Sequence, residues 1–174
     1  MKITTIITTK NRVSLFERAL KSVLNQVRQP DEIIVVSDST EDNFLKEKDI
    51  VNDYATIIKD RYTHNYPGSL NTAIHFKLGS DLFHYVDYQN EYIAFLDDDD
   101  MWYPEYLLKC EIACQSKDFV ISGIRYISEK GEIFLSIPQE VKVDDFLQGN
   151  PHFQGSNTFI RLSTLLQAGL FDEM

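Results

Sequence analysis

Four consecutive aspartates, Asp97–Asp100, follow directly on the apolar segment Tyr92–Leu96, and Trp102 and Tyr103 come soon after them. The apolar segment has the composition of a strand that is buried on both faces of a sheet. Neighbouring carboxylates repel each other by about 1 kcal/mol per pair even in water, and by more near a protein surface. The end of a buried strand is therefore a costly position for four of them unless a cation binds there.

Two earlier segments have the same form. Lys2–Thr9 is rich in β-branched residues and Glu32–Ser37 is largely apolar, as is typical of buried parallel strands, and each gives way to polar residues. Between them, the apolar spacing of Ser14–Gln26 predicts a helix, with Ser14 and Glu17 placed as a capping box. Strand, helix and strand in this order predict a right-handed parallel βαβ unit.

The rest of the chain continues to alternate between helical and extended patterns. The expected elements are a helix within Glu41–Tyr54, a strand at Ala55–Asp60, a helix at Asn71–Leu78, a helix from near Pro104 to about Gln115, two strands across Phe119–Ile137 joined by a turn at Glu129–Gly131, a helical turn at Asp144–Leu147, a strand at Ser156–Leu162, and a last helix that Gly169 ends. This order predicts one α/β domain, 1–174, with a mostly parallel, Rossmann-like central sheet flanked by helices. Polar residues follow three of its strands at the carboxyl edge, where open α/β sheets bind ligands.

Composition excludes some classes of function. The formal net charge of −10 argues against broad binding to a nucleic-acid backbone. Cys110 and Cys114 are expected to be small buried side chains in a reducing compartment. No window approaches the roughly 20 apolar residues of a membrane span. We expect a cytoplasmic protein, with peripheral contact at the inner membrane face left open.

The aspartate run has two interpretations. On an extended chain Asp97 and Asp99 point one way and Asp98 and Asp100 the other, and such carboxylates suit Mg²⁺ or Mn²⁺ shared with a substrate phosphate. The alternative is a solvated acidic turn at the start of the next helix, where negative charge is favourable. The position of the run at the ligand edge of the sheet favours the metal site.

Five segments in order resemble family 2 of the inverting glycosyltransferases, which have the GT-A fold and use nucleotide-diphosphate sugars. They are Ile3–Gln26, Asp31–Thr40, Asn65–Ile74, Tyr92–Pro104 and Gly155–Glu173. The resemblance implies a GT-A domain of the nucleotide-diphospho-sugar transferase superfamily, with 1–100 as its nucleotide-binding half and 101–174 as the start of its acceptor half.

The resemblance also implies a set of site residues. Nucleotide or sugar contacts are expected from Thr8, Thr9, Asn11, Arg12, Asp38, Asn71, Asp97 and Asp98, and ligation of Mn²⁺ or Mg²⁺ from Asp99 and Asp97. Each contact has a plainer alternative: Thr9 ends a strand, Asp38 is a turn residue or helix cap, and Asn71 is a helix cap. Trp102 is expected to pack beneath the site rather than to stack on sugar.

The chain departs from the family pattern in four places. The loop that carries Gly68 and Asn71 is shorter than is common in the family. Lys10 stands where an aromatic residue is usual, and the second strand ends with the single acid Asp38 instead of two acids and a glycine. The family's catalytic base usually follows a Phe-Asp-Glu motif, and here the sequence stops at Met174, immediately after that motif. We therefore expect the base to lie beyond Met174, with Asp172 as a weak candidate, and the domain to be truncated on the acceptor side.

The expected function is metal-dependent transfer of a hexose, with inversion, from a nucleoside-diphosphate sugar to an acceptor hydroxyl. A UDP-sugar is the expected donor, the acceptor is a glycan, a lipid-linked molecule or a protein, and the expected role is synthesis of cell-surface polysaccharide. Two alternatives stay open: a Mg²⁺-dependent nucleotidyltransferase, and a fragment that binds a nucleotide sugar without catalysis.

Overall fold

The computed structural model describes residues 1–60, 66–79, 88–135 and 142–172. In chain order its elements are β1 (Lys2–Thr9), α1 (Val13–Leu24), β2 (Glu32–Ser37), α2 (Glu41–Val51), β3 (Thr56–Lys59), α3 (Tyr66–Leu78), η2 (Tyr88–Asn90), β4 (Glu91–Asp97), α4 (Tyr106–Ala113), β5 (Phe119–Ile121), β6 (Ile124–Ser128), β7 (Gly131–Leu135), α5 (Val143–Gln148), η3 (Gly155–Asn157), β8 (Thr158–Arg161) and α6 (Leu162–Gln167).

The central sheet has the strand order β3-β2-β1-β4-β8-β5. The first four strands in this order are mutually parallel, and β8 runs antiparallel to both β4 and β5. The apolar runs predicted as strands therefore lie at the centre of the sheet, where both faces are covered. The predicted α/β architecture with a mostly parallel sheet is confirmed.

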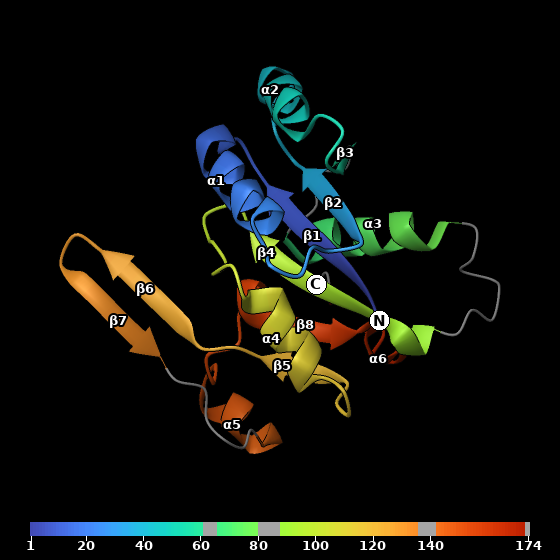
Figure 1. Ribbon diagram of the computed structural model, residues 1–174, viewed down its shortest axis with the longest axis vertical. Helices are drawn as coiled ribbons and strands as arrows, with labels where there is room; N and C mark the ends of the chain where they lie inside the picture. Colours follow the sequence, from blue (N-terminus) through green and yellow to red (C-terminus); the bar gives the residue numbers. More distant parts are fainter. Residues whose placement is uncertain (61–65, 80–87, 136–141, 173–174) are drawn as a thin grey trace.

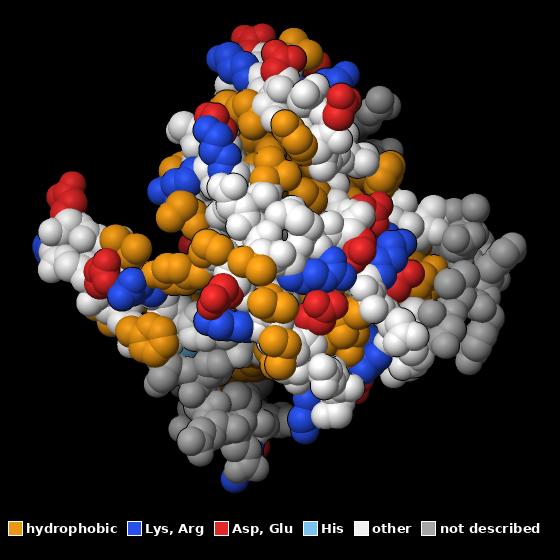
Figure 2. All heavy atoms as spheres, in the orientation of Figure 1, with side chains coloured by type: hydrophobic (Ala, Val, Ile, Leu, Met, Phe, Trp, Pro, Cys, Tyr) orange, Lys and Arg blue, Asp and Glu red, His pale blue; other side chains and the backbone are white. Residues whose placement is uncertain are grey.

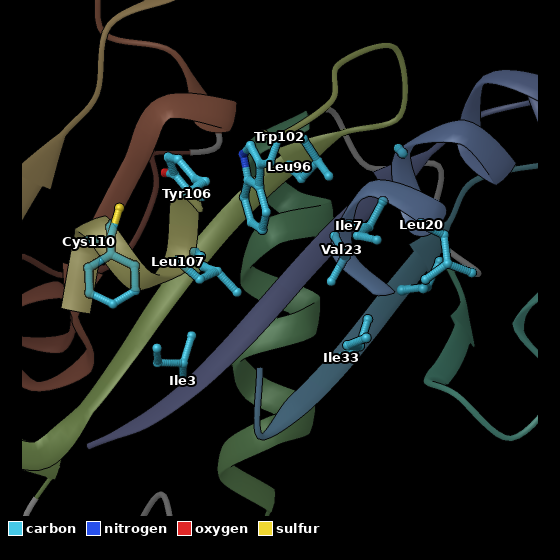
Figure 3. Close-up of a cluster of buried hydrophobic side chains, with 14 of the residues drawn as sticks. Ile3, Ile7, Leu20, Val23, Ile33, Leu96, Trp102, Tyr106, Leu107 and Cys110 are labelled. Carbon is cyan, nitrogen blue, oxygen red and sulfur yellow. The ribbon is translucent and has the colours of Figure 1, made fainter. Parts of the chain in front are cut away.

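Helices cover both faces of the sheet (Figure 1). One core cluster lies under α1 and α4, and the other under α3 and α6. Figure 3 shows the first cluster, in which α1, α4 and the strands meet through Ile3, Ile7, Leu20, Val23, Ile33, Leu96, Trp102, Tyr106, Leu107 and Cys110. Cys110 and Cys114 are both buried, as predicted.

The predicted capping box at the start of α1 is wrong. The helix begins at Val13, so Ser14 already lies in its first turn, and the cap position falls to Arg12, whose side chain makes no capping hydrogen bond. Glu17 forms an ion pair with Lys21 one turn later, at 2.7 Å, instead of reaching back to the start of the helix. The side chain of Arg12 is thereby free to point toward the carboxyl edge of the sheet.

The third helix also begins earlier than the sequence predicts. We expected a turn around Pro67 and Gly68 and a helix from Asn71, but α3 starts at Tyr66. Proline is tolerated in the first turn of a helix because its missing amide would have no partner there. The predicted turn at Pro67–Gly68 is therefore wrong, and the rest of that predicted turn, 61–65, lies outside the described residues.

Three strands, rather than two, occupy 119–135. The first, β5, joins the main sheet beside β8, while β6 and β7 form a separate hairpin with the predicted turn. The break falls at Gly123, where an added Cβ would lie 3.1 Å from the ring of Phe134 and 3.2 Å from the carbonyl oxygen of Leu135. A glycine at this position lets the chain leave the sheet and pass close beneath the hairpin.

The β6–β7 hairpin projects from the side of the domain (Figure 1) and carries exposed apolar side chains (Figure 2). The most exposed of these are Ile127, Ile133 and Phe134. Two hydrogen bonds tie the hairpin to the domain: Arg125 donates to the Tyr103 hydroxyl at 2.8 Å, and Gln154 donates to the Tyr126 hydroxyl at 2.5 Å. Within the residues that the structure describes, no helix combines the length and apolar character needed to cross a bilayer.

Candidate functional site

The carboxyl ends of β1, β2 and β4 meet at one edge of the sheet. In the parallel register Thr8 lies opposite Asp97 of β4, and Thr9 lies opposite Ser37 of β2. Thr9 is buried and Thr8 is half-buried. Residues predicted from three separate segments of the chain are therefore brought together, because parallel strands in register end at the same edge.

Three of the four aspartates form a cluster at this edge. One carboxylate oxygen from each of Asp97, Asp99 and Asp100 lies within 4.8 Å of the other two. The predicted alternation of side chains is wrong for Asp100, because the strand ends at Asp97 and the chain turns there, with the Asp100 amide donating to the Asp97 carbonyl at 3.1 Å. Three hard oxygen donors at this spacing fit Mg²⁺ or Mn²⁺.

Asp98 does not belong to this cluster and is completely buried. Its oxygens lie 2.6 Å and 3.2 Å from Arg12 guanidinium nitrogens, and the Lys10 amide donates to it at 3.3 Å. Burial raises the pKa of Asp98, while the nearby Thr9 hydroxyl and the charge of Arg12 oppose the rise. In this structure Asp98 has no surface open to a ligand, and its contact with the donor stays a prediction.

Arg12 links the buried aspartate to the cluster. Its second terminal nitrogen lies 2.7 Å from Asp99, and Arg18 donates to the Asp99 carbonyl at 2.6 Å. Burial alone would lower the pKa of Arg12, but Asp98 and Asp99 outweigh it, so the pKa is raised. The positive charge of Arg12 thus balances part of the negative charge of Asp98 and Asp99.

Asp97 is half-buried at the end of β4, whereas Asp99 is exposed. Its amide donates to the Ser156 hydroxyl at 3.0 Å, which fixes the end of β4 against η3. Burial raises the pKa of the Asp97 carboxyl; a hydrogen bond from Tyr66 opposes this, and the charges of Asp100 and Asp99 add to it. A divalent cation would relieve this repulsion, so the electrostatics of the cluster also fit a metal.

Gly155 allows the Tyr66 hydroxyl to approach Asp97. A Cβ at Gly155 would lie 2.1 Å from that hydroxyl oxygen and 3.4 Å from Asp97 Oδ1. We expect Gly155→Ala to displace the phenol and to lower the free energy of unfolding by about 1–2 kcal/mol. Urea denaturation measures this cost.

The matched control for this prediction is Gly155→Ala combined with Tyr66→Phe, which removes the clashing oxygen. The double variant should recover most of the lost stability, and Tyr66→Phe alone gives the baseline. A Gly155→Ala protein as stable as the wild type would contradict the close packing of Tyr66 against Gly155.

Asp38 lies directly after β2 and faces the residue that departs from the family pattern. Lys10 Nζ is 2.5 Å from the Asp38 carboxylate, and the Asp38 amide donates to the Thr9 carbonyl at 2.9 Å. The lysine side chain is largely exposed, whereas the aspartate is mostly buried. The pair places a donor and an acceptor side by side at the rim of the site.

Asn71 joins two distant parts of the chain. Its amide donates to the Phe171 carbonyl at 2.9 Å and its oxygen accepts the Phe171 amide at 3.1 Å. Phe171 packs edge-on against Phe95 in the core beneath α6, and Asp172 next to it is exposed. The helix-cap alternative for Asn71 is wrong, because it lies inside α3.

Trp102 packs beneath the site, as predicted. The indole is 7% exposed, stacks on Tyr106 with ring centroids 4.4 Å apart, and donates to the Ser156 carbonyl at 2.7 Å. The sequence patterns did not predict that Tyr66, Gly155 and Ser156 belong to the site. Their contribution depends on contacts with Asp97 across many intervening residues, and local sequence patterns carry no signal for such contacts.

Comparison with known proteins identifies the family. The model for "Glycosyl transferase family 2" matches residues 4–166. The chain belongs to this family. Two curated relatives are an uncharacterised glycosyltransferase of Nostoc sp., 29% identical over 120 residues, and one of Rickettsia conorii, 30% identical over 130 residues. These matches cover 69% and 72% of this chain but only 35% and 20% of the relatives, so the chain spans about a third or less of their length.

Solved structures confirm the fold. Staphylococcus aureus TarS superposes with a TM-score of 0.70 at 18% identity, covering 98% of this chain and 30% of that protein. Its fragment 1–349 in complex with UDP-GlcNAc gives a TM-score of 0.69 at 18% identity, covering 98% of this chain and 48% of the fragment. At this level of identity the likeness shows the fold alone, and that fold is the GT-A type predicted from the sequence.

Proposed function

We propose that this glycosyl transferase family 2 chain binds a nucleoside-diphosphate sugar and takes part in transferring its sugar, with inversion, to an acceptor hydroxyl. The observation that carries the proposal is the cluster of Asp97, Asp99 and Asp100 at the carboxyl edge of a parallel sheet. That edge is where open α/β sheets bind nucleotides. The structures of TarS 1–349 in complex with UDP and with UDP-GlcNAc favour a UDP-sugar as the donor.

Asp99 and Asp97, joined by Asp100, would hold Mn²⁺ or Mg²⁺. When bound, such an ion supplies Lewis-acid stabilisation of the departing diphosphate. The chain's own residues would supply the nucleotide contacts. Thr8, Thr9 and Asn11 lie beneath the nucleotide at the end of β1. Asp38 and Lys10 offer a hydrogen-bond acceptor and a donor to the nucleobase. Asn71 supports this surface from α3 through its clamp on Phe171.

Arg12 has a second task in this proposal. In the structure it balances the charge of Asp98 and Asp99. A guanidinium at this position can turn from Asp99 to a phosphate oxygen, because carboxylate and phosphate oxygens both accept charge-assisted hydrogen bonds from it. Asp98 would keep the other side of the guanidinium in place, which gives this buried acid a supporting role in donor binding.

The two halves of the chain would have different roles in the reaction. Residues 1–100 would form the nucleotide-binding half and 101–174 the start of the acceptor half, with a carboxylate general base supplied from beyond Met174 rather than by the exposed Asp172. A hexose donor and a cell-surface glycan, lipid-linked or protein acceptor complete the proposal. The buried, free Cys110 and Cys114 suit the reducing cytoplasm.

Titration with UDP in the presence and absence of MnCl₂ tests donor binding, and a product assay with UDP-sugars tests turnover. We expect UDP binding to depend on the metal, because without it the negatively charged diphosphate would be repelled by the carboxylates of the cluster. Release of UDP supports sugar transfer, pyrophosphate would identify a nucleotidyltransferase, and tight binding without product would identify a binding fragment. No affinity for any nucleoside diphosphate with Mn²⁺ would refute the proposal.

A further inference from the structure

A buried carboxyl group lies beneath the nucleotide edge of the sheet and belongs to none of the predicted site residues. Glu47, on the inner face of α2, is completely buried. The Ser37 hydroxyl donates to one of its oxygens at 2.5 Å and the Ser39 hydroxyl donates to the other at 2.7 Å. These two serines flank Asp38, the residue proposed to contact the nucleobase. The Glu47 side chain therefore holds both sequence neighbours of Asp38.

Each serine also accepts a backbone amide, which makes it a relay. The Ser39 amide donates to the Ser37 hydroxyl at 3.3 Å, and the Asn11 amide donates to the Ser39 hydroxyl at 2.7 Å. A hydroxyl has a single proton, and Ser39 donates its proton to Glu47 while its oxygen accepts the Asn11 amide. Glu47 thus acts on the turn after β1 through Ser39, although among the described residues it makes no hydrogen bond to that turn.

The turn held in this way has a backbone that needs support. Asn11 has a φ of +56°, in the left-handed region that residues other than glycine seldom adopt. Its side-chain oxygen accepts the Thr40 amide at 2.8 Å and the Asn43 amide group at 3.1 Å. The same turn carries Lys10, which faces Asp38, and Arg12, which faces the acid cluster.

Burying a carboxyl group costs stability, and its hydrogen bonds to Ser37 and Ser39 offset only part of that cost. An apolar side chain would fill the same space beneath α2 at lower cost, so the carboxyl group points to a role for these hydrogen bonds. We propose that Glu47 is a positioning residue: through Ser39 and Asn11 it fixes the turn that presents Lys10 and Arg12 to the donor. This inference rests on the proposed function and extends it to a residue that has no contact with the ligand.

Glu47→Gln tests the inference with almost no change in volume. The amide replaces one acceptor oxygen with a donor, so one serine hydroxyl loses its acceptor. We expect the Kd for UDP in MnCl₂ to rise by about tenfold, and in turnover the donor KM to rise by a similar factor at nearly constant kcat. Hydrogen exchange at the Asn11 amide should accelerate by about tenfold as the turn loosens.

Val51→Ala is the matched control. Val51 lies one turn further along α2 and is buried in the apolar core, and its hydrocarbon side chain cannot hydrogen-bond to the serines. It should lower the melting temperature at least as much as Glu47→Gln while leaving both the UDP Kd and exchange at Asn11 nearly unchanged. Ser39→Ala, which removes the relay itself, should reproduce the effect of Glu47→Gln, and the two changes combined should cost little more than either alone.

Two results would overturn the inference. One is UDP affinity in Glu47→Gln equal to that of the wild type, or weakened only as far as in Val51→Ala. The other is unchanged exchange at Asn11 in Glu47→Gln, which refutes the positioning role whatever the nucleotide titration gives. If the wild type itself binds no nucleoside diphosphate with Mn²⁺, the proposed function fails instead, and exchange at Asn11 still decides whether Glu47 holds the turn.

Discussion

Asp99→Asn is expected to reduce metal-dependent release of UDP from a UDP-sugar by about 100-fold or more. The change removes one of three clustered carboxylates and leaves a neutral side chain of the same shape. Asp99 is 49% exposed, so its replacement should alter the free energy of unfolding by no more than about 0.5 kcal/mol. Initial rates over a range of MnCl₂ concentrations measure the effect, and Mn²⁺ titration measures the loss of the ligand directly.

The control for this prediction is Asp49→Asn, which removes one negative charge from the exposed surface of α2. It should leave the rate and the metal dependence unchanged, because the acid cluster keeps all its ligands. Wild-type activity in Asp99→Asn would exclude Asp99 as a metal ligand. An equal loss in both variants would point to net charge instead of ligation.

Lys77→Met is expected to cause the largest loss of stability, about 2–3 kcal/mol. Lys77 is 4% exposed and lies 3.0 Å from both Glu32 and Glu91, at the amino-terminal edge of the sheet opposite the site. Removing the cation leaves two carboxylates facing each other. Breaking a fully buried pair costs about 3–5 kcal/mol, and partial exposure of both glutamates lowers that figure here. Urea denaturation at pH 7 measures the loss.

The pH dependence of this variant gives a second measurement. Burial alone would lower the pKa of Lys77, but Glu91 and Glu32 outweigh it, so the pKa is raised above its ordinary value. The stabilisation is therefore complete below about pH 10 and is lost only as the pH rises through the folded-state pKa. The stability deficit of Lys77→Met should therefore stay constant from pH 7 to about pH 10 and shrink only above it.

A variant that also carries Glu32→Gln and Glu91→Gln separates charge from packing. The amides repel each other far less than carboxylates do, so this triple variant should regain much of the stability that Lys77→Met loses. A Lys77→Met protein with wild-type stability at pH 7 would contradict the structural role of this ion pair. Because the pair lies at the far edge of the sheet, none of these changes should alter nucleotide affinity.

The sequence was most informative where local pattern and burial agree. The strands Lys2–Thr9, Glu32–Ser37 and Glu91–Asp97 are recognisable because a strand covered on both faces needs an unbroken apolar run. Their shared direction follows from the helices between them, and shared direction places Asp97–Asp100 at the ligand edge. Fold, family and the acidic edge could all be predicted from these runs and the polar residues that follow them.

Elements whose boundaries depend on partners were predicted less well. The helix that begins at Tyr66 contains Pro67 and Gly68, and only the position of its first turn makes them acceptable. The strand Phe119–Ile121 is read locally as part of a hairpin, and its pairing with β8, nearly forty residues further along the chain, assigns it to the main sheet. Propensity is a local quantity, and both cases were decided by long-range contacts.

The sequence by itself determined that acids would gather where buried parallel strands end, because apolar periodicity fixes the strands and chain direction fixes their common edge. Tertiary structure alone decided what each acid does there. Asp97, Asp99 and Asp100 converge, while Asp98 is buried against Arg12 and Glu47 is held by Ser37 and Ser39. A carboxyl group takes its role from the charges and hydrogen-bond donors around it, and here those come from segments distant in the chain.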